Sequence, residues 1–309
     1  MAEPLAYFNG RYVPFREAAL PLADAGFVYG ATVVDNVRTY GRQLFRWAEH
    51  LARFRRDCQS CFVPLAATDE ELTAAAAELV SHNARLLEPG GELQLVAFAT
   101  PGPLGLYQGE KANGPPTLGM HTYPLPFARF RRFFTEGAVL AIVGHPAADS
   151  PAILSPRHKH RSRMSWWKAE RLANESPHPP GAVALLARGP DATIAETAFA
   201  NFLCVINGCV VIPPEEEVLD GISLRETIAL CLARGYDVAR RPIAAAEIGN
   251  MSEAMLTGTA FGIAGVKSID GRELKWPGPV TAALLAAWSE LAGLDIVRQF
   301  VADQSPGGP

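Results

Sequence analysis

Strand-like and helix-like patterns alternate along most of this chain, and this alternation constrains the fold more than any other feature. Near the start, Asn9-Gly10 separates two short runs and predicts a tight hairpin. The β-branched run from Val33 to Tyr40 predicts a strand, and Trp47 to Cys61 has the periodicity of a helix. Thr68 to Glu71 forms a capping-box pattern before an alanine-rich segment, which predicts a further helix to about Leu87. The expected fold class is α/β, in the sense of mixed α and β elements.

The second half of the chain continues the same alternation. The strands expected there cover 138–143, 182–187, 202–206 and 209–212, and the last helix covers about 280–292. Residues 124–134 contain proline and arginine and are expected to form a connection between domains. A chain of 309 residues is too long for one small core. We therefore expect four parts: a small N-terminal α/β domain over 1–125, a linker over 126–133, a larger domain over 134–303 and a tail over 304–309.

Composition and charge exclude several classes of function. The formal net charge of −4 indicates no basic surface for a nucleic acid, and no apolar run is long enough to cross a membrane. The first residues lack the charged start and apolar stretch of a signal peptide. The five cysteines are scattered, and Cys58 and Cys61 lack the second pair that a zinc site needs. We expect a cytoplasmic protein with reduced thiols, no metal and a small-molecule substrate.

The segment Lys159-His160-Arg161-Ser162-Arg163 is the first candidate for chemistry. Only five of the 28 basic residues are lysines, and this one lies between a short apolar run and an amphipathic helix pattern. Arginine stays protonated, whereas a buried lysine can lose its proton and attack a carbonyl as a free amine. An arbitrary lysine is usually a solvated surface residue. The motif from Glu196 to Asn201 lies downstream and provides a carboxylate that could tune a group held by the lysine.

A cofactor held by a lysine, such as pyridoxal phosphate, needs a partner for its ring nitrogen and donors for its phosphate. Glu196 is the candidate for the ring nitrogen, where a carboxylate keeps the ring protonated. Gly221 to Glu226 predicts a helix start, with Ser223 and Glu226 as a capping box and free N–H groups that could bind an anion. Thr257 to Ala260 is a small-residue turn that could provide a second set of donors.

These motifs resemble the class IV pyridoxal-phosphate enzymes, a family that includes branched-chain and D-amino-acid aminotransferases and aminodeoxychorismate lyase. The resemblance extends from Phe8 to about Val266. Its N-terminal matches are Asp24 to Gly30, Val37 to Tyr40 and Glu49 to Arg53. It implies two domains of the D-amino-acid aminotransferase-like type, a smaller N-terminal one and a larger C-terminal one, with pyridoxal 5'-phosphate between them. It also implies a homodimer, in which the loop at 101–116 is a candidate contact with the neighbouring subunit.

The resemblance carries the family's functional residues onto this chain. It implies that Lys159 is the Schiff-base lysine and Glu196 the partner of the ring nitrogen. The residues that it implies around the cofactor are Arg53, Lys159, Arg163, Glu196, Asn201, Gly221, Ile222, Ser223, Thr257, Gly258 and Thr259. The candidates for contact with the substrate are Tyr29, Asp35, Arg38, Thr100 and Ala260.

Several departures from the family pattern lie on the expected substrate side. Thr100-Pro101-Gly102 stands where many members carry Thr-Arg-Gly, and in D-amino-acid members that arginine helps to hold the substrate carboxylate. Val34-Asp35 replaces a common Phe-Glu pair, and Gly265-Val266 replaces Pro-Val. Because of these changes, the amino donor, the acceptor and the stereochemistry stay open.

The expected activity is transamination through a Lys159 Schiff base, with an amino acid or amine as donor and a keto acid as acceptor. The freed lysine would remove the α proton as general base, and the two half-reactions would give ping-pong kinetics. Two alternatives stay open. Lys159-His160 followed by Arg163 resembles the lyase members, which need no keto-acid acceptor. A non-catalytic descendant could keep the fold to bind a metabolite.

Overall fold

The computed structural model describes residues 3–145, 154–175, 177–189 and 192–302, and the chain divides into two compact units. Unit 1 comprises Met1–Leu125 together with His158–Arg163, and unit 2 comprises Pro126–Arg157 together with Met164–Pro309. Residues 304–309, expected to be a tail, lie outside the described residues.

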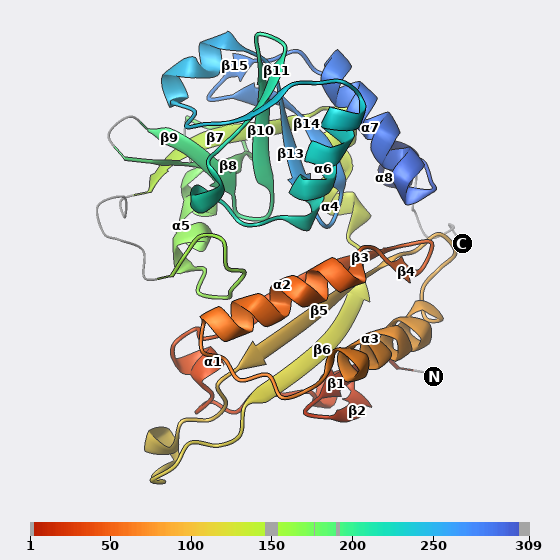
Figure 1. The fold of residues 1–309 in the computed structure, drawn as a ribbon, viewed down its shortest axis with the longest axis vertical. Helices are drawn as coiled ribbons and strands as arrows, with labels where there is room; N and C mark the ends of the chain where they lie inside the picture. The colour runs from red at the N-terminus through yellow and green to blue at the C-terminus, as the bar shows by residue number, and fades with distance from the viewer. Residues whose placement is uncertain (1–2, 146–153, 176, 190–191, 303–309) are drawn as a thin grey trace. The chain divides into compact units, whose positions relative to one another are not determined.

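Unit 1 is built on a six-stranded sheet in the order β2-β1-β6-β5-β3-β4. Its strands are β1 (Leu5–Phe8), β2 (Arg11–Pro14), β3 (Val33–Tyr40), β4 (Gln43–Leu44), β5 (Leu93–Thr100) and β6 (Thr117–Pro124). Its helices are α1 (Ala25–Val28), α2 (Trp47–Ser60) and α3 (Asp69–Ala84), with short 3₁₀ turns at Phe15–Glu17 and Gly105–Gln108. Within the unit, α2 and α3 cover the same face of the sheet (Figure 1).

The core of unit 1 lies between that sheet face and the two long helices. Alternate residues of β5, including Leu95 and Ala97, pack with Phe54 of α2 and Leu79 of α3. The side chains between them on β5 therefore point to the opposite face of the sheet.

Unit 2 is built on a nine-stranded sheet in which the extra pairing of β9 with β10 closes part of the sheet into a barrel. Its strands are β7 (Ala138–His145), β8 (Val183–Arg188), β9 (Thr193–Thr197), β10 (Asn201–Ile206), β11 (Cys209–Ile212), β12 (Val238–Arg240), β13 (Met251–Gly258), β14 (Gly262–Ile269) and β15 (Arg272–Glu273). Its helices are α4 (Phe127–Thr135), α5 (Met164–Leu172), α6 (Ile222–Ala233), α7 (Pro279–Ala292) and α8 (Ile296–Val301), with 3₁₀ turns at Glu215–Glu217 and Ala245–Asn250.

Most of the elements predicted from the sequence are present. The Asn9-Gly10 hairpin pairs Phe8 with Arg11, and the predicted strand from Val33 to Tyr40 is β3. The capping box at Thr68 is also confirmed, because its hydroxyl accepts the N–H of Glu71 and the Glu71 carboxylate accepts the N–H of Thr68.

The segment expected to be a connection at 124–134 is different, because most of it is the helix α4. The prolines and arginines pointed to an irregular segment, but Phe127, Phe130 and Phe133 recur every three residues and are buried on one face of the helix. Phe130 contacts Phe261 and Phe300 of the same unit, with ring centroids 5.3 and 6.4 Å apart. The linker expected over 126–133 is therefore packed structure.

A second difference concerns the lysine segment. His158–Arg163 was expected inside the larger domain, but it packs with the N-terminal residues as part of unit 1. A backbone bridge between Val33 and His160 explains this assignment, since it joins the segment to the start of β3.

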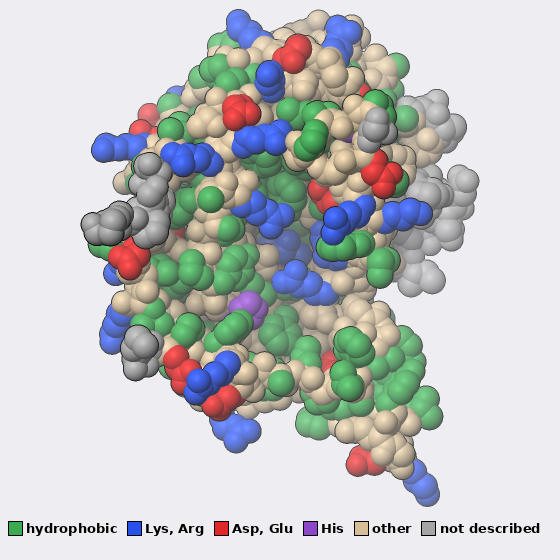
Figure 2. Space-filling view, turned by 180° about the vertical axis from the view of Figure 1, so that it is seen from behind, with side chains coloured by type: hydrophobic (Ala, Val, Ile, Leu, Met, Phe, Trp, Pro, Cys, Tyr) green, Lys and Arg blue, Asp and Glu red, His purple; other side chains and the backbone are tan. Residues whose placement is uncertain are grey.

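Charged and apolar side chains of the described residues are mixed on the surface (Figure 2). On the face that Figure 2 shows, lysine and arginine side chains of the described residues are interspersed with acidic and apolar ones. No helix in the described part of the chain combines the length and the apolar character that a bilayer crossing needs.

Glu253 in β13 anchors the start of α7. It is only 2% exposed, and its carboxylate accepts the N–H groups of Val280 and Thr281 at 3.0 and 2.9 Å and the Thr281 hydroxyl at 2.8 Å. The first N–H groups of a helix have no partner within the helix, so this carboxylate satisfies donors that would otherwise be unpaired.

We predict that Glu253→Ala lowers the free energy of unfolding by about 2–4 kcal/mol, because it leaves buried donors without a partner. Urea denaturation followed by circular dichroism measures the effect. The exposed Glu273 on β15 provides the control, and Glu273→Ala should change the value by less than about 0.5 kcal/mol. Equal effects of the two substitutions would contradict the capping role.

Candidate active site

Backbone hydrogen bonds attach the lysine segment to β3. The carbonyl of Lys159 accepts the N–H of Val34 at 3.0 Å, and the N–H of Arg161 donates to the carbonyl of Thr32 at 2.9 Å. The N–H of Lys159 donates to the Asp57 carboxylate of α2 at 2.9 Å. Asp57 is fully buried, so its position is fixed by the helix. The backbone of Lys159 is therefore held from both sides, by a strand and by a helix.

A buried ion pair lies in the same unit. Arg53 of α2 donates through Nε and Nη2 to the two carboxylate oxygens of Asp35 on β3, at 2.8 Å each. The Nδ1 of His50 lies 2.7 Å from the same carboxylate. Burial alone would raise the pKa of Asp35, but Arg53 and His50 hold it well below its usual range. Burial lowers the pKa of His50 despite the nearby carboxylate. The cluster therefore pairs the negative carboxylate of Asp35 with the positive guanidinium of Arg53.

These surroundings prepare the Lys159 amine for reaction. The pKa of the amine is lowered from 10.5 to about 8. Burial is the largest cause, the positive charges of Arg53, Arg163 and Arg161 act in the same direction, and Asp35 opposes them. A lysine with this pKa has a sizeable fraction of free amine near neutral pH. Only the free amine attacks a carbonyl or removes a proton.

In unit 2, Glu196 and Asn201 meet where β9 pairs with β10. One oxygen of the Glu196 carboxylate accepts the Asn201 amide at 2.8 Å and the N–H of Leu219 at 3.0 Å. Asn201 also donates to the Leu219 carbonyl at 3.0 Å. Both side chains are nearly buried, with 8% and 4% exposure. This network fixes the orientation of the carboxylate, as a partner for a ring nitrogen requires.

The start of α6 is a second feature of unit 2 that suits a cofactor. Gly221 is its N-cap residue, and no side chain caps the helix there. A side chain at position 221 would collide with the Asn201 amide oxygen, which explains the glycine. The predicted capping box at Ser223 is wrong: the helix begins at Ile222, so Ser223 lies within its first turn. The N–H groups of this turn remain available to an anion, as the phosphate role requires.

The threonines at the end of β13 lie beside this helix start. The Thr257 hydroxyl is 3.1 Å from the Thr227 hydroxyl, which also donates to the Ser223 carbonyl at 2.7 Å. Gly258 ends β13, and Thr259 and Ala260 follow it, partly buried, in the turn to β14. The predicted phosphate donors of unit 2 therefore come from two elements that contact each other.

The remaining predicted substrate residues have different surroundings. Tyr29 is 66% exposed. Arg38 is buried, with its guanidinium 3.8 Å from the Tyr40 ring centroid and its Nε donating to the Thr39 carbonyl. The buried Thr100 hydroxyl accepts the N–H of Gly102 at 3.1 Å. Arg38 and Thr100 thus make contacts within unit 1.

Four residues that were not singled out from the sequence contact the candidate site residues. Asp57 and His50 support the lysine and the ion pair, and Leu219 and Thr227 complete the networks of unit 2. Asp57 and Thr227 lie inside helices, and no local motif marks them. The described residues contain no group of His, Cys, Asp and Glu suited to a metal ion.

We predict that the Lys159 amine titrates near pH 8, so that its reactivity rises over a lower pH range than that of an ordinary lysine. Competitive labelling with a small acetylating reagent, read by mass spectrometry at several pH values, measures this. The other four lysines serve as internal references. A midpoint for Lys159 equal to theirs would contradict the environment described above.

Comparison with known proteins places this geometry in a family. The family model described as amino-transferase class IV matches residues 32–269. A Methanocaldococcus jannaschii protein with the provisional name branched-chain-amino-acid aminotransferase is 26% identical, over 92% of this chain and 95% of that protein. The D-alanine aminotransferase of Bacillus licheniformis is also 26% identical, over 89% and 92% of the two chains.

Solved structures have the same fold. The branched-chain amino acid aminotransferase of Escherichia coli superposes with a TM-score of 0.82 at 20% identity, over 98% of each chain. The predicted fold class is thereby confirmed. Since the family model spans most of the sequence, the chain belongs to the class IV aminotransferases.

Proposed function

We propose that this protein is a pyridoxal-phosphate-dependent aminotransferase that transfers an amino group between an amino acid, or an amine, and a keto acid, with Lys159 as the covalent lysine. The observation that carries the proposal is the Lys159 amine, with a pKa lowered to about 8 and a backbone held by Asp57 and Val34. A fixed lysine that is partly deprotonated near neutral pH is what covalent attachment of an aldehyde requires.

The residues present fit the cofactor. Glu196, held by Asn201 and the N–H of Leu219, would pair with the ring nitrogen. The uncapped N–H groups at Ile222 and Ser223 would bind the phosphate, with Thr257, Gly258 and Thr259 as the neighbouring donors. Arg53 and Arg163 would add positive charge from unit 1. When bound, pyridoxal phosphate supplies an electron-accepting ring that stabilises the charge left on a substrate carbon after proton removal.

Lys159 has two tasks in this proposal. Its amine would hold the cofactor, and Nζ, when free, would take the α proton of the substrate and later return it to a carbon. Because its pKa is near 8, Nζ can both accept and release a proton close to neutral pH. A second base is therefore not needed to return Lys159 to its free-amine form.

Asp35 sets the charge around that lysine. Its pairing with Arg53 at 2.8 Å keeps the carboxylate ionised and fixes the guanidinium. Without Asp35, the positive charges of Arg53, Arg161 and Arg163 would lower the pKa of Lys159 further. The ion pair thus limits how far the pKa of Lys159 is lowered, and therefore which fraction of the amine is deprotonated.

We expect Lys159→Ala to abolish turnover, with a loss beyond the factor of about 10²–10⁴ that a general base alone contributes. Steady-state rates with amino acid and keto acid pairs measure this, and Lys168→Ala is the control because Lys168 lies on α5, outside the proposed site. Turnover by Lys159→Ala comparable to that of the control would end the assignment.

We expect Glu196→Gln to slow the amino-acid half-reaction by about 10²-fold, because a neutral amide cannot keep the ring nitrogen protonated. The side chain keeps its size and can still accept from Asn201, so cofactor binding should change little. Stopped-flow absorbance separates the half-reaction rate from binding. An unchanged rate would show that Glu196 does not pair with the ring.

The same kinetics distinguish transamination from the lyase alternative. A transaminase consumes one keto acid for each amino acid converted and shows parallel double-reciprocal plots, whereas a lyase needs no acceptor. We also propose a homodimer in the cytoplasm. The dimer rests on the family resemblance, and the compartment rests on the five cysteines, all free thiols. Sedimentation velocity tests the dimer.

A further inference from the structure

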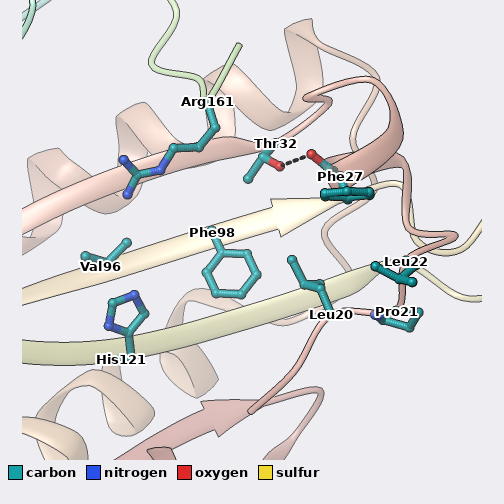
Figure 3. Close-up of a pocket in the computed structure, with 10 residues that line it drawn as sticks. Leu20, Pro21, Leu22, Phe27, Thr32, Val96, Phe98, His121 and Arg161 are labelled. Carbon is teal, nitrogen blue, oxygen red and sulfur yellow. Dashed lines mark hydrogen bonds between the residues drawn. The ribbon is translucent and has the colours of Figure 1, made fainter. Parts of the chain in front are cut away.

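Threonine hydroxyls that donate to a nearby backbone carbonyl occur in both units. Thr32, in a pocket of unit 1, donates to the Gly26 carbonyl at 3.4 Å, and Figure 3 shows this bond as a dashed line. Thr135, at the exposed end of α4 in unit 2, donates to the Arg131 carbonyl at 3.3 Å. Such bonds are local, and by themselves they indicate no role beyond the backbone that they contact.

Thr227 of α6 differs from these threonines in two ways. Its hydroxyl donates to the Ser223 carbonyl at the shorter distance of 2.7 Å, and it also lies 3.1 Å from the Thr257 hydroxyl of β13. Both threonines are buried, with exposed fractions of 0% and 1%. The second contact therefore joins a helix to a strand in the interior of unit 2.

The hydrogens of these hydroxyls can be assigned. A hydroxyl has one hydrogen to donate, and a carbonyl can only accept. The hydrogen of Thr227 therefore lies on the bond to Ser223, and the 3.1 Å contact becomes a hydrogen bond when Thr257 donates to Thr227. The result is a directed chain from Thr257 through Thr227 to the Ser223 carbonyl. The hydroxyls of Ser223 and Thr259 are not part of this chain.

The chain ends at the helix start that we propose for the phosphate, since Ser223 lies in the first turn of α6. On the other side of that turn, Gly221 packs so closely against the Asn201 amide oxygen that a side chain would not fit. Asn201 lies directly opposite Thr257 on the neighbouring strand, so their side chains share one face of the sheet. Two contacts with this face therefore fix the start of α6: Asn201 against Gly221, and Thr257 bonded to Thr227.

A fixed helix start matters for an anion. The first N–H groups of a helix bind a phosphate only when they point toward it together, so their direction decides the affinity. Thr227 lies one turn after Ser223 and is held by the strand through Thr257. A movement of the first turn away from β13 would have to break this buried hydrogen bond.

We propose that Thr227 is a positioning residue for the cofactor phosphate, which accepts the Thr257 hydroxyl and so holds the first turn of α6 against β13. This narrows the donor set given above. The Thr257 side chain then serves to position the helix, and the phosphate is bound by the N–H groups of the helix start and the hydroxyls of Ser223 and Thr259. The inference rests on the cofactor site of the proposed function, but not on the covalent lysine.

The test is isothermal titration of the full chain, freed of cofactor, with pyridoxamine 5'-phosphate and with pyridoxamine. The two compounds differ only in the phosphate, and neither has the aldehyde that a lysine attacks. We expect Thr227→Val to weaken binding of the phosphate compound about five- to tenfold, because it keeps the side-chain shape but removes one buried hydrogen bond. Thr227→Ser keeps the hydroxyl and should bind within about twofold of wild type.

Two controls accompany this comparison. The affinity for pyridoxamine should be equal in wild type, Thr227→Val and Thr227→Ser, because this compound does not reach the helix start with a phosphate. Thr135→Val removes the corresponding local bond of α4 and should bind both compounds as wild type does.

A double-mutant cycle tests the direction of the chain. Thr257→Val removes the donor of the same hydrogen bond, so its loss should equal that of Thr227→Val, and the double variant should bind no more weakly than either. Thr259→Val removes a separate phosphate donor, so its loss should multiply with that of Thr227→Val.

The outcomes separate this inference from the proposed function. If Thr227→Val binds pyridoxamine 5'-phosphate as tightly as wild type, or loses affinity equally for pyridoxamine, the positioning role is overturned. A larger loss in Thr257→Val than in Thr227→Val, with effects that multiply, would show that the Thr257 hydroxyl binds the phosphate itself and would also overturn it. If Thr227→Val does not fold, a comparison of Thr257→Val with Thr257→Ser decides in the same way. If the expected order of affinities is found but no adduct forms at Lys159 and no turnover occurs, the positioning role stands and the proposed function fails.

Discussion

The hydrogen bond from the Lys159 N–H to the buried Asp57 carboxylate holds the candidate site of unit 1 together. The segment containing Lys159 is far from α2 in the sequence, and this bond, with the pairing to β3, attaches it to the N-terminal unit. As a result Lys159 is surrounded by Arg53, Asp35 and its own neighbours Arg161 and Arg163. Removing the bond would release the backbone that positions the amine.

The charges of unit 1 are balanced in a way that suits a reactive amine. A lone buried guanidinium or carboxylate would cost several kcal/mol, so Arg53 and Asp35 are stable in the interior only as a pair. Burial is the largest cause of the lowered pKa of Lys159, and Asp35 opposes the positive charges that add to it. In unit 2, the Asn201 amide and the backbone N–H of Leu219 orient the Glu196 carboxylate in a similar way. Each unit thus prepares its functional group by contacts within itself.

The sequence predicted what depends on neighbouring residues. The Asn9-Gly10 hairpin, the capping box at Thr68 and the strand of Val33 follow from local turn chemistry and periodicity. Contacts between distant residues could not be predicted in this way: Lys159 and Asp57 are 102 residues apart, and an aspartate inside a helix has no signature.

Two local predictions failed because competing signals were stronger. The phenylalanine spacing of α4 outweighs its arginines and the prolines that precede it, and the helix at Ile222 starts before the apparent capping box at Ser223.

The central claim is that Lys159 carries pyridoxal phosphate, and the most direct measurement is covalent trapping. The purified protein is mixed with the cofactor, its visible absorption spectrum is recorded, and borohydride reduction is followed by peptide mass spectrometry. The account predicts a yellow protein whose reduced adduct maps to Lys159, and a Lys159→Ala variant without that band. A colourless wild-type protein, or an adduct on another lysine, would contradict it.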